Sequence, residues 1–100
     1  MIVCSVKKNE SLYEINIKGH SGYDTIGKDI VCSAVSSSFI LTVNLLDKLK
    51  SNMDLITDES IPMMKVTINN YNDIEETILD NLIDCLKDVS RQYPKYLKIK

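Results

Sequence analysis

A stretch of apolar residues at helical spacing, from residue 30 to residue 49, most constrains how this chain can fold. Its first half is apolar almost all round, relieved only by one alanine and four serines. A helix of this kind is normally central and packs closely on a sheet. Asp29 precedes it as a candidate N-cap, which would place Cys32 in the first helical turn. The apolar positions are Val31, Val35, Phe39, Ile40, Val43, Leu46 and Leu49.

Segments typical of β-strands flank this helix on both sides. A second helix is predicted to begin at Asp73 and to end before Pro94. The sequence therefore predicts an α+β domain over residues 1–100, a two-layer sandwich of order ββαββα(β) with two helices on a mostly antiparallel mixed sheet. The predicted strands are residues 1–6, 11–17, 53–58, 63–68 and 96–99, and the apolar face of the second helix is formed by Ile74, Ile78, Leu82, Leu86 and Val89.

Charge and cysteine usage narrow the classes of function. With 14 acidic and 12 basic residues, the net charge of −2 offers no concentrated basic face, so direct nucleic-acid binding is not expected. We find no apolar run approaching the roughly 20 residues of a membrane span and no signal-peptide pattern, so a cytoplasmic protein is expected. Three scattered cysteines and one histidine favour neither a disulfide framework nor structural zinc, and no metal or other cofactor is expected. Cys4 and Cys85 are predicted to be core residues.

The residues that could take part in catalysis lie between residues 19 and 36. The single histidine, His20, lies at the start of a glycine-rich loop over residues 19–28, and Cys32 follows on the helix. A thiol near a helix N-terminus is favoured as thiolate, an imidazole can activate it and then protonate a leaving amine, and free backbone N–H groups can bind an oxyanion. A buried cysteine, a loop histidine and a capping aspartate would use the same residue types. Both interpretations stay open on the residues alone.

Two strings in this region, GHSGY at residues 19–23 and GKDIVCSAVS at residues 27–36, resemble the signature of the ribosomal-processing cysteine protease (Prp) family. The resemblance implies that Cys32 is the nucleophile, that His20 is the base, and that Asp29 is a third catalytic residue, which either orients the imidazole or caps the helix. It also implies a substrate-binding role for a set of small residues, with Ser21 standing where alanine is common in the family. That set is Gly19, Ser21, Gly22, Gly27 and Ser36.

The same resemblance implies partners. Members of the family form homodimers of this two-layer fold and remove a short N-terminal extension from a large-subunit ribosomal protein, number twenty-seven, in Gram-positive-type bacteria. They cut after a pair of aromatic residues. The apolar surface of the first helix independently favours a homodimer. We further hypothesise that residues 22–27 form a lid that closes over an extended peptide.

Two other interpretations compete with a protease. Residues 22–28 match the first seven positions of a P-loop, but Asp29 stands where a magnesium-binding hydroxyl is needed, which argues against nucleotide binding. The second alternative is a non-catalytic, ribosome-associated assembly or binding factor in which Cys32 and His20 are incidental. Faster alkylation of Cys32 than of the other cysteines would favour the protease over this binding factor.

Five apolar residues could line a hydrophobic groove or belong to the core, and we favour the core for most of them. They are Met53, Leu55, Met63, Met64 and Tyr71.

Overall fold

The computed structural model confirms the predicted order of elements. It describes the backbone of residues 1–19 and 26–100, and the side chains of residues 1–19 and 30–100. Within that part of the chain there are two helices and a five-stranded mixed sheet. The strands are β1 (Ile2–Lys8), β2 (Leu12–Lys18), β3 (Met53–Asp58), β4 (Met63–Asn69) and β5 (Leu97–Ile99), and the helices are α1 (Ile26–Lys48) and α2 (Asp73–Gln92).

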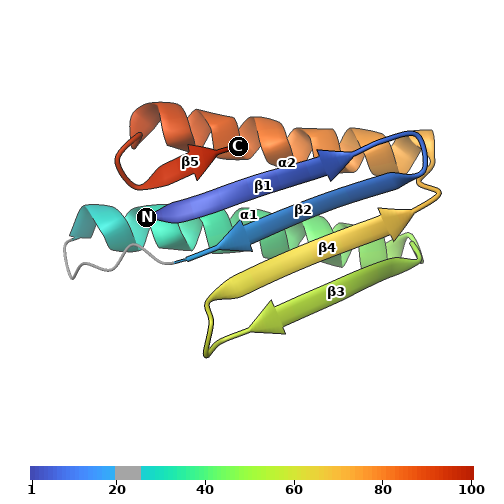
Figure 1. The fold of residues 1–100 in the computed structure, drawn as a ribbon, viewed down its shortest axis with the longest axis horizontal. Coiled ribbons are helices and arrows are strands. Elements are labelled where there is room, and N and C mark those ends of the chain that lie inside the picture. Colours follow the sequence, from blue (N-terminus) through green and yellow to red (C-terminus); the bar gives the residue numbers. More distant parts are fainter. Residues whose placement is uncertain (20–25) are drawn as a thin grey trace.

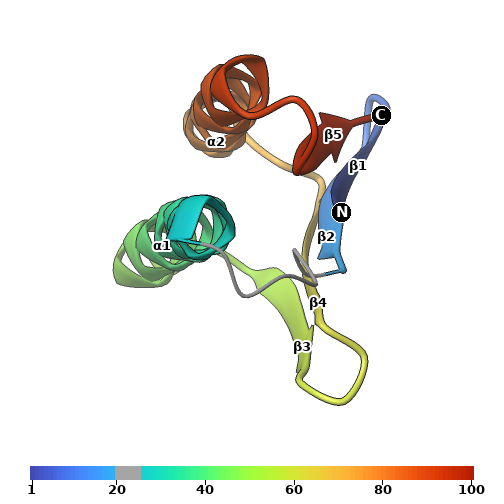
Figure 2. The same ribbon diagram turned by 90° about the vertical axis from the view of Figure 1, so that its left-hand side faces the viewer.

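The sheet has the strand order β3-β4-β2-β1-β5. Neighbouring strands are antiparallel except β1 and β5, which pair in parallel. Both helices lie side by side on one face of this sheet, as Figures 1 and 2 show, so the predicted two-layer arrangement is confirmed. β3 is an edge strand, and the hairpin that it forms with β4 projects beyond the rest of the sheet (Figure 2).

The core lies between the sheet and the helices, because alternate side chains of each strand point toward the helical layer. Tyr13 and Ile15 of β2 are buried opposite Ile68 and Val66 of β4. Burial of each large apolar side chain stabilises the fold by roughly 1.5–3 kcal/mol. The helices contribute Val31, Val35, Phe39, Val43 and Leu46 from α1 and Leu79, Leu82 and Leu86 from α2.

A capping box fixes the start of α2. The side-chain oxygen of Asn72 accepts a hydrogen bond from the backbone N–H of Glu75 at 2.8 Å, and the Glu75 carboxylate accepts one from the backbone N–H of Asn72 at 2.9 Å. These two bonds satisfy N–H groups that a helix start leaves unpaired. Ile74, predicted on the apolar face, is exposed instead, and Leu79 takes a buried position. The buried side of α2 therefore begins at Glu75, one position later than predicted.

The start of α1 differs from the prediction. The helix begins at Ile26, so Asp29 lies inside it and is not its N-cap, and Cys32 lies in the second turn rather than the first. The sequence predicts Gly27 in a loop, but one glycine inside a helix costs only about 1 kcal/mol relative to alanine. Gly27 and Lys28 belong to the same helix. The predicted loop over residues 19–28 is therefore shorter on its C-terminal side.

Two expectations about burial and hydropathy are wrong. Cys85 is exposed on α2, whereas Cys4 is buried in the core as predicted. Ile30–Lys48 of α1 also has the length and mean hydropathy, 1.6, of a membrane span, contrary to the expectation that no segment approaches that limit. Length and composition alone give this result, and a core helix with apolar residues on more than one side meets the same criterion.

Candidate active site

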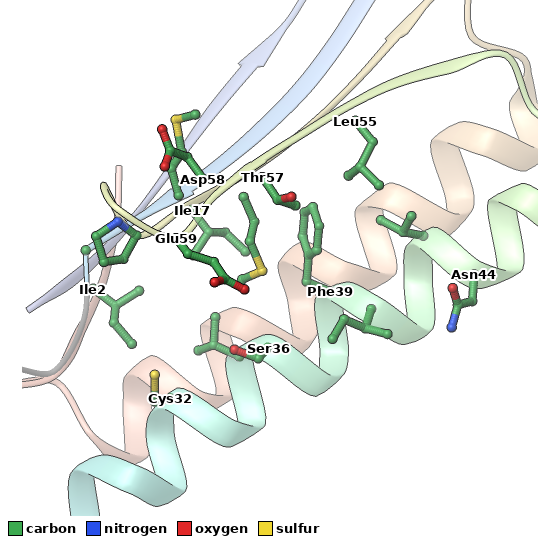
Figure 3. Close-up of a pocket in the computed structure, with 17 residues that line it drawn as sticks. Ile2, Ile17, Cys32, Ser36, Phe39, Asn44, Leu55, Thr57, Asp58 and Glu59 are labelled. Carbon is green, nitrogen blue, oxygen red and sulfur yellow. The ribbon is translucent and has the colours of Figure 1, made fainter.

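A pocket of about 540 Å³ lies between the inner face of α1 and the β3–β4 hairpin. Figure 3 shows Cys32, Ser36 and Phe39 following one another along the side of α1 that faces this pocket. Thr57, Asp58 and Glu59 lie across from them at the end of β3. The apolar part of the lining comes from Ile2, Ile17, Val35, Phe39, Ile40, Val43, Leu55, Pro62, Met63 and Met64.

The helical repeat explains why one thiol and one hydroxyl share this wall. Residues four apart lie on the same side of a helix, so Cys32 and Ser36 are neighbours one turn apart. Cys32 is half-buried and packs against the core. Its place inside α1 also corrects a detail of the predicted chemistry. In a regular α-helix the N–H of residue 32 bonds to the carbonyl of residue 28, so this N–H is not free to bind an oxyanion.

The β3–β4 turn forms the opposite wall. The Asp58 carboxylate accepts hydrogen bonds from the Ser60 hydroxyl at 2.7 Å, the Ser60 N–H at 2.9 Å and the Ile61 N–H at 3.3 Å. These hydrogen bonds hold the pKa of Asp58 below its ordinary value, and the bond from the Ser60 hydroxyl contributes most. The next residue, Glu59, directs its carboxylate into the pocket, on the side of Ser36 (Figure 3). Asp58 therefore organises the turn, and Glu59 supplies a carboxylate to the pocket.

Gly19 connects the sheet to this pocket. Its backbone has a φ of +96°, and its N–H donates to the Pro62 carbonyl at 2.8 Å. A β-carbon at this position would lie 2.6 Å from the carbonyl oxygen of Met1, so only glycine fits without a backbone shift. Gly19 lines the same pocket as Cys32, and it directly precedes His20 in the sequence.

The residues predicted for the site fall into three groups. The structure brings Gly19, Cys32 and Ser36 to one pocket. Gly27 and Asp29 lie in the N-terminal part of α1. The remaining predicted residues, His20, Ser21 and Gly22, lie outside the described part of the chain, as does most of the hypothesised lid over residues 22–27. The pairing of Cys32 with His20 and the roles of the other residues stay predictions.

Sequence reasoning missed most of the second wall. Thr57, Asp58 and Glu59 have no catalytic spacing in the sequence, and only the β3–β4 hairpin places them opposite α1. Asn44 lines the pocket from α1 itself. Leu55, Met63 and Met64 line the pocket, whereas Met53 and Tyr71 pack against the core. Among the described side chains, no group of three or more His, Cys, Asp or Glu residues is arranged to hold a metal ion.

A half-buried thiol lies on the wall of a mainly apolar pocket in a small two-layer α+β fold, and a thiol-dependent hydrolase uses a site of this kind. The family model of the cysteine protease Prp matches residues 1–98. The chain belongs to this family of cysteine proteases.

Solved structures share the fold over the whole chain. The essential ribosomal processing protease Prp from S. aureus, in complex with a substrate peptide, has a TM-score of 0.89 at 20% identity, and the match covers 100% of this chain and 98% of that one. The same S. aureus protease with a covalently linked product peptide gives a TM-score of 0.87 at 21% identity, with coverage of 100% and 98%. SMU.848 from Streptococcus mutans gives 0.88 at 23% identity, with coverage of 100% and 92%. A search of curated protein sequences gave no match.

Proposed function

We propose that this chain removes the N-terminal extension of a large-subunit ribosomal protein, number twenty-seven, by cutting after a pair of aromatic residues in the cytoplasm. The observation that carries the proposal is the place of Cys32, half-buried at a pocket that Gly19 also lines. Membership of the cysteine protease Prp family supports it. So does the substrate peptide bound to the S. aureus ribosomal processing protease of the same fold.

The proposed chemistry is acyl transfer through a thioester. His20 takes the proton of the Cys32 thiol, and the sulfur attacks the carbonyl carbon of the scissile peptide bond. The C–N bond breaks, the amine leaves with the proton from His20, and the N-terminal fragment stays bound to sulfur. Water, deprotonated by the same imidazole, then releases that fragment as a carboxylic acid. Asp29, which lies inside α1 and not at its N-cap position, is proposed to orient His20.

The pocket supports an aromatic residue as the substrate group. Its volume of about 540 Å³ exceeds the space of one side chain, so a pair of rings and the attached backbone can enter together. Phe39 offers an aromatic contact, and the thioethers of Met63 and Met64 adapt to ring edges. The Ser36 hydroxyl, one turn beyond Cys32, is proposed to hydrogen-bond to the bound peptide.

A homodimer is the second part of the proposal. Large exposed apolar side chains are carried by Leu41 and Leu45 of α1, by Leu49 just after its end and by Ile40 at the pocket. Such a group of apolar side chains is typical of a protein interface. Size-exclusion chromatography with light scattering tests this, and a monomer at all working concentrations would contradict it.

The decisive experiment incubates wild type and Cys32→Ala with a peptide that contains the N-terminal extension, whose last two residues are aromatic. Mass spectrometry detects the cleavage products. We expect wild type and the control Cys85→Ala to cut after the second ring, and Cys32→Ala to leave the peptide intact. His20→Ala should be equally inactive. Cleavage by Cys32→Ala would remove Cys32 from the mechanism, and no cleavage of this peptide or of the intact ribosomal protein by wild type would overturn the proposed substrate.

A further inference from the structure

The pocket combines an apolar lining with one carboxylate that the described residues leave without a partner. Among the described side chains that line it there is no lysine or arginine. Glu59 has no hydrogen bond or ion pair with any described residue, although its carboxylate points into the pocket (Figure 3). We propose that Glu59 is a specificity-determining residue that selects a peptide with a positive charge close to the aromatic pair. This inference rests on the proposed function.

The two neighbouring carboxylates of the hairpin differ in what they can do. Asp58 is held by Ser60 and Ile61, and its pKa is lowered by those bonds, so its charge is already satisfied within the turn. Glu59 follows it directly and carries no such bonds to the residues that the structure describes. A carboxylate at the edge of an apolar pocket gains from a cationic partner, because part of its water shell is replaced by apolar lining. Glu59 is therefore the one available to a substrate.

The turn that carries Glu59 is fixed on both sides. Asp58 ties its first residues through Ser60, and the Pro62 carbonyl at its end accepts the N–H of Gly19 at 2.8 Å. Glu59 therefore stays opposite the side of α1 that carries Cys32 and Ser36 (Figure 3). Because Cys32 and Glu59 line one pocket, a peptide that fills this pocket while its scissile carbonyl is at the Cys32 sulfur lies close to this carboxylate. The cation that it meets is a lysine or arginine side chain, or the N-terminal ammonium of a short leader.

The expected size of the effect follows from the exposure of Glu59. Glu59 is exposed, so solvent screens its ion pair with a cation of the substrate. Ion pairs between exposed groups stabilise by roughly 0.2–1 kcal/mol. A lysine-containing peptide should therefore be cut about 1.4- to fivefold faster than its neutral counterpart, measured as kcat/KM. The preference should reside in KM and fall as salt is added. A role in orienting catalytic groups would instead change kcat for all peptides alike.

The experiment uses matched peptides with the same aromatic pair. A lysine, a norleucine or a glutamate is placed in turn at each flanking position, and each peptide is made with a free and with an acetylated N-terminus. The enzymes are wild type, Glu59→Gln, Glu59→Lys and the control Asp54→Asn. Asp54 lies on β3, the strand that leads into the turn of Glu59. Its side chain faces away from the helices, because the adjacent Leu55 pairs with buried Val66. The binding of each peptide to Cys32→Ala and to Cys32→Ala/Glu59→Gln is measured in parallel.

We expect wild type and Asp54→Asn to prefer the lysine peptide at one position, Glu59→Gln to lose the preference, and Glu59→Lys to prefer glutamate there. Loss of preference only on acetylation assigns the cation to the ammonium group. Cleavage without any charge preference, or a preference that survives in Glu59→Gln, would overturn the inference and leave the proposed function intact. If wild type cuts none of the peptides, the proposed function fails, and binding to Cys32→Ala without charge preference would overturn the role of Glu59 as well.

Discussion

The two helices share one face of the sheet and bury their side chains differently. α2 has Leu79, Leu82 and Leu86 on its buried side and a row of charged residues outside. α1 buries a comparable set, but it also exposes Leu41 and its neighbours and lines the pocket with Cys32. An amphipathic helix with one apolar face contributes mainly to stability, whereas apolar surface left beyond the core is available for binding. α2 therefore holds the fold together, and α1 together with the β3–β4 hairpin forms the functional side.

The largest contrast that we expect is in thiol reactivity. Burial raises the pKa of Cys4 to about 11, so only on the order of one thiol in ten thousand is ionised near neutral pH. Cys32 opens to the pocket. In the native protein, iodoacetamide should label Cys32 at least about a hundredfold faster than Cys4, and also faster than exposed Cys85 if His20 activates it. Peptide mass spectrometry over time measures the three rates. Equal labelling of Cys4 and Cys32 before unfolding would contradict the contrast.

Leucine-to-alanine substitutions should lower the free energy of unfolding by different amounts in the two helices. Leu82→Ala on α2 removes a buried side chain and leaves a cavity, so it should lower the free energy of unfolding by about 2–5 kcal/mol. Leu41→Ala on α1 removes an exposed one and should change it by less than about 0.5 kcal/mol. Urea unfolding at low protein concentration measures both values for the protomer. Similar losses for the two variants would show that α1 has no spare apolar surface.

Gly19→Ala should affect the pocket side and the stability together. The φ of +96° and the contact of the new β-carbon with the Met1 carbonyl force a backbone shift. The strain should cost about 1–3 kcal/mol of unfolding free energy, and kcat/KM should fall because Gly19 lines the pocket. Lys18→Ala, at the exposed neighbouring position, is the control. Full cleavage activity in Gly19→Ala would show that the backbone here does not position the site.

Asn72→Ala tests the opposite region. Loss of the N-cap of α2 should lower the unfolding free energy by about 1 kcal/mol. Because α2 contributes no residue to the pocket lining, kcat/KM should stay unchanged at temperatures where the protein is folded. Asn72→Asp keeps a side-chain acceptor and is expected to retain most of the stability. A change in kcat/KM in folded Asn72→Ala would mean that a structural change at the start of α2 alters the pocket.

The fold could be predicted from the sequence because its patterns are local and strong. Alternation over residues 11–17 and the apolar spacing of α2 belong to single elements, and their order left few sheet arrangements. The start of α1 could not be predicted, because glycine is typical of loops and the sequence does not show that Gly27 belongs to a helix. Cys85 was misjudged for a related reason. Free cysteine is usually buried, but its position on α2 is set by the helical repeat rather than by residue type.

The candidate site could be predicted in part. The string around Cys32 carries the family signature, so the thiol was found without the structure. Glu59 and Thr57 lie far from Cys32 in the sequence and reach it only because the β3–β4 hairpin lies beside α1. Such long-range placement leaves no spacing that a sequence can show. The glycine at residue 19 was visible, but its reason, a positive φ beside Met1, was not.

The smallest effect that we expect concerns the turn that carries Glu59. Hydrogen bonds from Ser60 and Ile61 hold the pKa of Asp58 below its ordinary value of 3.8. A carboxyl group with a lowered pKa in the folded state stabilises the protein above its unfolded pKa, and this stabilisation is lost as the pH falls through the folded pKa. Asp58→Asn should therefore be slightly less stable than wild type at neutral pH, and the difference should shrink below about pH 4. Urea unfolding across this range measures it.

Ser60→Ala provides the matched test, because it removes the hydroxyl donor and leaves the carboxylate in place. It should reproduce part of the loss at neutral pH and weaken the charge preference assigned to Glu59 by loosening the turn. Asp54→Asn, which removes a charge from the other side of β3, should show neither effect. If the difference between Asp58→Asn and wild type grows as the pH falls, the ionised carboxylate does not stabilise the turn. The position of Glu59 would then depend on the Pro62 contact with Gly19 alone.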